Sequence, residues 1–152
     1  MPNPQPQARP ATGQSNTGQP AQDISTRIDA PFAAVDRFLA DPLNWPLWAA
    51  GLGTLSRDPA RGWTTRSPDG RTMRVDFAPA EAAAGIHDHT VTPPDGGAVI
   101  TVPLRAAAAG DDATLVTLTL IRQPEMDDAA YARDAEAVAA DLQRLKATLE
   151  RH

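Results

Sequence analysis

The C-terminal part of the chain most constrains the fold, because residues 127–150 contain neither Gly nor Pro. Val138, Leu142, Leu145 and Leu149 recur there at intervals of four, three and four residues, which places them on one face of a helix. Burying four such side chains is worth about 6–12 kcal/mol, at roughly 1.5–3 kcal/mol each. That sum is comparable to the net stability of a small domain. The helix is therefore expected to dock on the rest of the chain.

The residues before this helix have the pattern of strands and turns. Between the first two strands, PFAAVDRFLA predicts a helix over 31–40, and DPLNWPLWAAGLG predicts a turn or broken helix. Asp127 or Asp128 is suited to cap the long helix. A sheet-rich body closed by one long helix is an α+β pattern. Strands are predicted near 23–29, 52–58, 63–67, 72–77, 85–92, 98–107 and 114–121.

Size and composition exclude several classes of protein. The chain has 152 residues, enough for one domain with a core. It has no Cys, which excludes disulfides, thiolate metal sites and a Cys nucleophile. The net charge is −5 with no basic run, so no nucleic-acid surface is expected. Neither a membrane span nor a signal peptide is evident, and a cytoplasmic location is predicted. The sequence does not indicate an oligomeric state.

The N-terminal segment 1–21 differs in composition from the rest. It is rich in Pro, Gln, Gly, Ser and Thr, and its only apolar residues are Met1 and alanines. Such a segment cannot bury enough surface to offset the entropy lost on ordering. We therefore predict a disordered tail over 1–21, followed by one domain over 22–152.

Several segments share their order and character with one known superfamily. They are APFAAVDRFLADP, the tryptophan turn NWPLW, the GW…SPDG hairpin, GIHDHTV and the closing DAEAVAADLQRLKATLE. Over residues 22–152 the chain thereby resembles the SRPBCC, or START-like, superfamily, which includes polyketide cyclases, aromatases and lipid-transfer domains. The resemblance implies a helix-grip fold. In that fold a curved antiparallel sheet of about seven strands grips the C-terminal helix, two short helices follow the first strand, and an apolar cavity lies between sheet and helix.

Two histidines are the sharpest candidates for chemistry. His87 and His89 are two residues apart on a predicted strand, so they share a face, with Asp88 on the other. Lining a pocket, they could orient a carbonyl or phenol, or act as acid and base near neutral pH. Alternatively, they lie on a solvated face. His89, with His87 beside it, is our predicted catalytic group.

No metal or cofactor is predicted. Zinc would need a third and fourth ligand, and the only other histidine, His152, is at the chain end. The sequence has no phosphate-binding glycine loop, no GxSxG and no HExxH. Arg105 is expected to face outward, because Ile100, Val102 and Leu104 read as the inward set of its strand.

Three functions remain open. The first is binding of a small hydrophobic or aromatic molecule in the internal cavity. The second is a polyketide cyclase or aromatase-type enzyme that uses a cavity histidine as acid or base, and the third is a protein-interaction domain with a filled cavity. Trp45 is expected to plug the core, whereas Trp48 is as suited to the cavity wall as to the core. The predicted ligand-binding residues are Trp48, Met73, Val75, Phe77, His89, Val102, Leu118, Val138 and Leu142.

Overall fold

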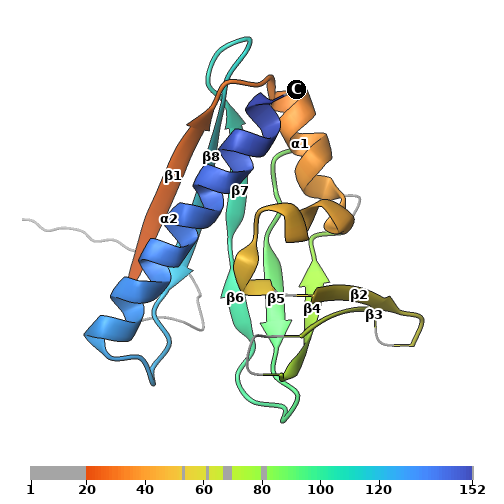
Figure 1. The fold of residues 1–152 in the computed structure, drawn as a ribbon, viewed down its shortest axis with the longest axis vertical. Helices are drawn as coiled ribbons and strands as arrows, with labels where there is room; N and C mark the ends of the chain where they lie inside the picture. Colours follow the sequence, from red (N-terminus) through yellow and green to blue (C-terminus); the bar gives the residue numbers. More distant parts are fainter. Residues whose placement is uncertain (1–19, 53, 61, 67–69, 80–81, 152) are drawn as a thin grey trace, which may run out of the picture.

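The computed structural model describes residues 20–151 except 53, 61, 67–69 and 80–81. The predicted α+β class, with curved antiparallel sheets and a C-terminal helix, is confirmed (Figure 1). The predicted tail up to residue 19, part of the predicted hairpin turn (67–69) and His152 lie outside the described residues. The elements are β1 (Ala21–Ile28), α1 (Phe32–Ala40), the 3₁₀ helices η1 (Pro42–Leu47) and η2 (Ala50–Leu52), β2 (Thr54–Asp58), β3 (Gly62–Arg66), β4 (Thr72–Phe77), β5 (His89–Thr92), β6 (Ile100–Val102), β7 (Leu104–Ala108), β8 (Thr114–Ile121) and α2 (Asp128–Glu150).

The strands form two antiparallel sheets, ordered β1-β8-β7 and β2-β3-β4-β5-β6. The chain passes from one sheet to the other at Pro103, between β6 and β7. Proline has no N–H to donate, so a strand ladder is interrupted there. The Pro103 carbonyl still accepts a 3.0 Å hydrogen bond from the Thr119 N–H. The single strand predicted over 98–107 is therefore two strands, which accounts for eight strands rather than about seven.

The segment before β5 continues the pairing with β7, although it is not a regular strand. The His87 N–H donates to the Leu104 carbonyl at 2.8 Å, and the Ala106 N–H donates to the Gly85 carbonyl at 2.9 Å. Only the second half of the strand predicted over 85–92 is thus regular. The pairing nevertheless fixes the position of His87 relative to the sheet.

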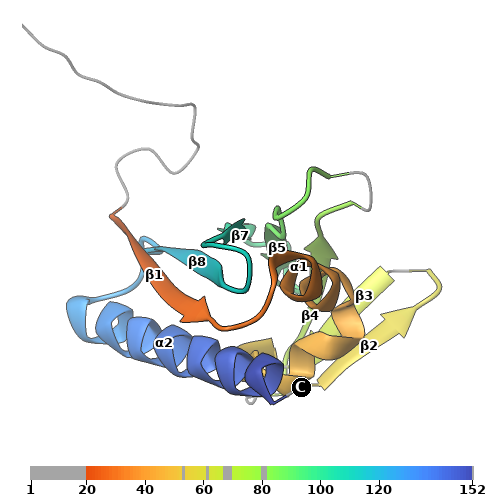
Figure 2. The ribbon, with the colours of Figure 1, turned by 90° about the horizontal axis from the view of Figure 1, so that it is seen from above.

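The helix α2 lies along one face of β1 and β8, and its C-terminal end lies close to α1 and η1 (Figures 1 and 2). Leu142, Leu145 and Leu149 are buried, whereas Val138, one turn earlier on the same face, is half-buried. The Asp127 side chain accepts a 2.7 Å hydrogen bond from the Ala130 N–H, as predicted for a helix cap. Among the described residues, no helix has the length and apolar character needed to cross a membrane.

Trp45 in η1 and Trp48, which directly follows η1, are at the centre of the core. Trp45 and Trp48 are 1% and 2% exposed, with ring centroids 4.9 Å apart. Trp45 Nε1 donates to the Leu39 carbonyl at 2.9 Å, so its polar atom is satisfied. The prediction that Trp45 plugs the core is confirmed, and Trp48 shares that position.

Candidate functional site

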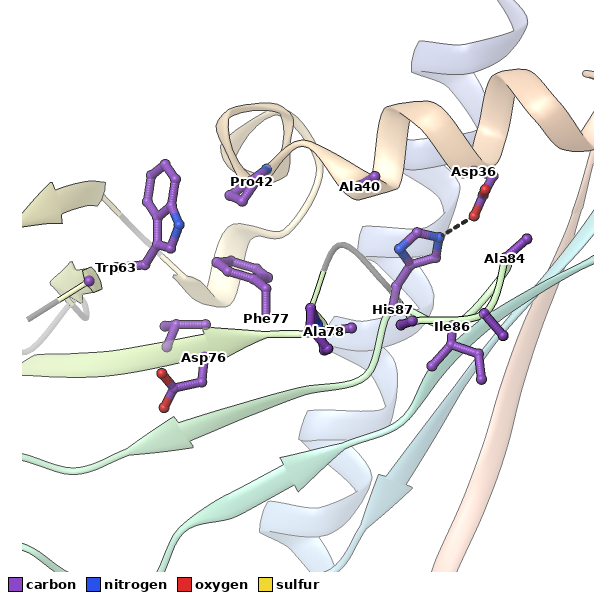
Figure 3. A pocket seen from close by; sticks show the side chains of 15 residues that line it. Asp36, Ala40, Pro42, Trp63, Asp76, Phe77, Ala78, Ala84, Ile86 and His87 are labelled. Atoms are coloured by element: carbon purple, nitrogen blue, oxygen red, sulfur yellow. Dashed lines mark hydrogen bonds and ion pairs between the residues drawn. The ribbon is translucent and has the colours of Figure 1, made fainter.

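A pocket of about 480 Å³ opens between α1, the start of η1, strands β3 and β4, and the segment that precedes His87 (Figure 3). Its volume falls within the range of small-molecule sites, roughly 300–1,000 Å³. Of the fifteen described residues that line it, eleven are apolar. The apolar lining residues are Trp63, Val75, Phe77, Ile86, Pro42, Pro79 and the five alanines 40, 78, 82, 83 and 84. The other lining residues are Gly62, Asp36, Asp76 and His87.

A carboxylate on α1 fixes the polar end of this pocket. Asp36 lies beside the buried Val35 at the border of the helix's apolar face. Its Oδ1 accepts two hydrogen bonds, one of 2.9 Å from the Gly85 N–H and one of 2.7 Å involving His87 Nε2. Asp36 therefore joins α1 to the segment before β5 and holds the imidazole in place.

The His87 ring borders the pocket. The residue is 8% exposed, and Figure 3 shows one ring nitrogen bonded to Asp36 and the other turned toward the space beside Phe77. This second nitrogen, Nδ1, has no hydrogen-bond partner among the described residues. A smaller hollow of about 20 Å³, enough for one water molecule, also borders His87 and Phe77. The pair Asp36–His87 thus presents a ring nitrogen to the pocket.

His89 occupies a different environment. Its ring stacks edge-on against Trp45 at 4.7 Å, and its Nδ1 donates a long 3.4 Å hydrogen bond to the His87 carbonyl. Burial lowers the pKa of His89 to about 4, because the charged form loses its hydration. His89 does not line the pocket. Of the two histidines predicted to face a pocket, only His87 lines this one.

The low pKa of His89 predicts a pH-dependent stability. Between about pH 6.5 and about 4 the unfolded chain binds a proton at this site that the native protein does not bind. The free energy of unfolding should therefore fall by about 3 kcal/mol as the pH is lowered through that interval. Urea denaturation at several pH values, compared with His89→Gln, would measure this contribution. Parallel pH curves for the two proteins would contradict it.

The outward side of the same segment carries an ion pair. Asp88 Oδ2 lies 2.7 Å from Arg105 Nη2, and Asp88 Oδ1 accepts from Arg105 Nε at 2.8 Å. The hydrogen bonds from Arg105 lower the pKa of the Asp88 carboxyl. The predicted outward orientation of Arg105 is confirmed, and so is the opposition of Asp88 to the two buried histidines.

The structure brings together only part of the predicted ligand-binding set. Val75 and Phe77 line the pocket, while Met73 borders a separate hollow of about 360 Å³ formed with β3 and the turn after β5. The remaining predicted residues pack in or against the core and do not line this pocket: Trp48, His89, Val102, Leu118, Val138 and Leu142. These residues do not line the pocket because it lies beside α1, whereas we expected the site between α2 and the sheet.

Among the residues that line the pocket, the sequence analysis predicted only Val75, Phe77 and His87. It did not single out Asp36, Trp63 or Ile86. The one available signal was an acidic residue directly beside the apolar face of a short helix. Asp36 and His87 are 51 residues apart, so no local spacing reveals their contact.

Comparison with solved structures finds this arrangement of sheet and helix in other proteins. A START superfamily protein from Mycobacterium smegmatis superposes with a TM-score of 0.64 at 11% sequence identity, over 88% of this chain and 99% of that chain. The chain has a START-like fold. No protein-family model and no curated protein matches the sequence.

Two further structures with the same fold come from biosynthetic gene clusters. DynU16, from the dynemicin biosynthetic locus, superposes with a TM-score of 0.64 at 18% identity, over 86% of this chain and 47% of its own. The di-domain ARO/CYC protein StfQ of the steffimycin pathway gives 0.61 at 16% identity, over 86% and 45%. This START-like chain therefore spans about half of each. At these identities the likeness establishes the fold alone.

Proposed function

We propose that the protein binds a small hydrophobic or aromatic molecule in the pocket beside α1. The observation that carries the proposal is the composition of the pocket. Trp63, Phe77, Ile86 and alanines line it together with His87, whose Nδ1 has no hydrogen-bond partner in the described part of the chain. Small-molecule sites are concave and mostly apolar, with a few placed polar groups that fix orientation. The START-like fold is consistent with such a role.

A substitution that fills the pocket tests this proposal. Ala40 and Ala33 are both exposed residues of α1, but only Ala40 lines the pocket. We expect Ala40→Leu to weaken binding of the fluorescent probe N-phenyl-1-naphthylamine by about tenfold or more, because the added side chain occupies the space of the ligand.

Ala33→Leu is the matched control, since it makes the same change on the same helix. Its affinity for the probe should equal that of the wild type. If the two variants bind the probe equally, or the wild type does not bind it, the site is not in this pocket. Native mass spectrometry of protein purified from its own source would then identify the class of any co-purifying molecule.

The second candidate is an enzyme of the polyketide cyclase or aromatase type, and the pair Asp36–His87 favours it. A carboxylate that orients an imidazole, whose other nitrogen faces a pocket, is the arrangement of a general base and its orienting group. His87 would remove a proton from a carbon next to a carbonyl, and the resulting enolate carbon would attack a second carbonyl carbon of the same molecule. The C=O π bond of that second carbonyl would open to an alkoxide, which takes the proton back from His87. This candidate requires turnover that is lost in His87→Gln while binding is retained.

A further inference from the structure

We propose that the ligand has a phenolic or enolic hydroxyl group that donates a hydrogen bond to Nδ1 of His87. In this proposal Asp36 makes Nδ1 an acceptor, because it fixes the tautomer of the imidazole. This inference rests on the proposed binding function. It adds the chemical class of the ligand and the role of a positioning residue.

The tautomer follows from the chemistry of the partner. A carboxylate only accepts hydrogen bonds, so the 2.7 Å contact between Asp36 Oδ1 and His87 Nε2 requires the hydrogen on Nε2. In the neutral imidazole the other nitrogen, Nδ1, is then an acceptor. The Gly85 N–H also donates to Oδ1, which keeps the carboxylate from turning away. By keeping the hydrogen on Nε2, Asp36 therefore makes Nδ1 a hydrogen-bond acceptor.

The surroundings of Nδ1 favour a flat ligand with one donor. Trp63 and Phe77, whose rings are perpendicular and 6.1 Å apart, line the same pocket as the imidazole. The second carboxylate on the pocket, Asp76, is paired with Arg74 at 3.0 Å. A ligand carboxylate beside Asp36 would meet a like charge. An aromatic or enolic hydroxyl supplies the donor without that repulsion.

A pair of probes that differ only in the donor tests the inference. We expect 2-naphthol to bind about tenfold more tightly than 2-methoxynaphthalene at about pH 8, where histidine is ordinarily neutral. Methylation removes the O–H and keeps the ring system. In His87→Leu the ratio of the two dissociation constants should fall to about one.

Variants of the acidic residues separate positioning from charge. In Asp36→Asn an amide oxygen can accept the same two N–H groups, so the preference for 2-naphthol should be retained. In Asp36→Ala the imidazole loses its orientation, and the preference should fall. Asp128→Asn, which changes a carboxylate paired with Arg122 and away from the pocket, should leave the preference unchanged.

The tautomer itself can be read in the wild-type protein by ¹⁵N NMR of the histidine rings, with His87→Leu assigning the signal. A hydrogen on Nε2 supports the inference, and a hydrogen on Nδ1 of the neutral ring overturns it. Equal binding of the two naphthalenes also overturns it while leaving the proposed function in place. If neither probe binds, both the inference and the proposed function fall.

Discussion

Leu145→Ala is expected to lower the free energy of unfolding by about 3–5 kcal/mol. Leu145 is fully buried and lies between Leu142 and Leu149 on the face of α2 that contacts the sheet and η1. Removing its side chain loses the transfer energy of the buried atoms and leaves a cavity. Few groups can move to fill that cavity, because the neighbouring leucines are held by the same helix. Equilibrium denaturation in urea, followed by circular dichroism, measures the change.

Leu43→Ala is the matched control for this prediction. Leu43 is in η1 and is 67% exposed, so the same truncation removes little buried surface. Its effect should stay within about 0.5 kcal/mol. Similar losses for the two variants would mean that the C-terminal half of α2 does not carry the docking that the fold assigns to it.

Local signals were sufficient to predict most of the elements. The alternation of Val116, Leu118 and Leu120 predicted β8, which lies between β1 and β7 in its sheet. The acidic residue Asp127 before an uninterrupted helical pattern predicted the cap. These features depend on residues within one or two turns of each other, which a sequence displays directly.

The division of the strand over 98–107 was also readable from the sequence. Pro103 lies inside that predicted strand, and a proline without an N–H argues against an uninterrupted ladder. We predicted one strand from the alternation of apolar residues on both sides of Pro103. Leu104 is buried and Arg105 is exposed, as predicted, whereas Ile100 and Val102 are half-buried.

The position of the pocket was not predictable, because it depends on contacts between distant segments. His87 and His89 share one face of the chain, and the sequence gives no reason to rank them. The structure separates them through Trp45, which stacks on His89, and through Asp36, which holds His87 at the pocket. The START-like resemblance pointed to the space under α2, and the pocket described here is beside α1.

Gly85→Ala is expected to destabilise the protein by about 2–5 kcal/mol, although it adds a single methyl group. Gly85 has a φ of +87°, a conformation that costs an L-residue roughly 1–2 kcal/mol. An added Cβ would also lie well inside van der Waals contact with the Ala106 carbonyl oxygen. That oxygen belongs to β7, and Ala106 is hydrogen-bonded to the Gly85 carbonyl, so relief requires separating the two segments, at a further cost of about 1–3 kcal/mol.

Gly96→Ala separates the two contributions. Gly96 has a φ of +74°, and no atom lies within 4 Å of the Cβ that alanine would add. It should therefore lose only about 1–2 kcal/mol, the cost of the left-handed conformation. The difference between the variants, measured by urea denaturation, isolates the contact with β7. Equal losses would mean that the segment 85–87 can move away from β7, and Asp36 and His87 would then not be held in the geometry that the pocket requires.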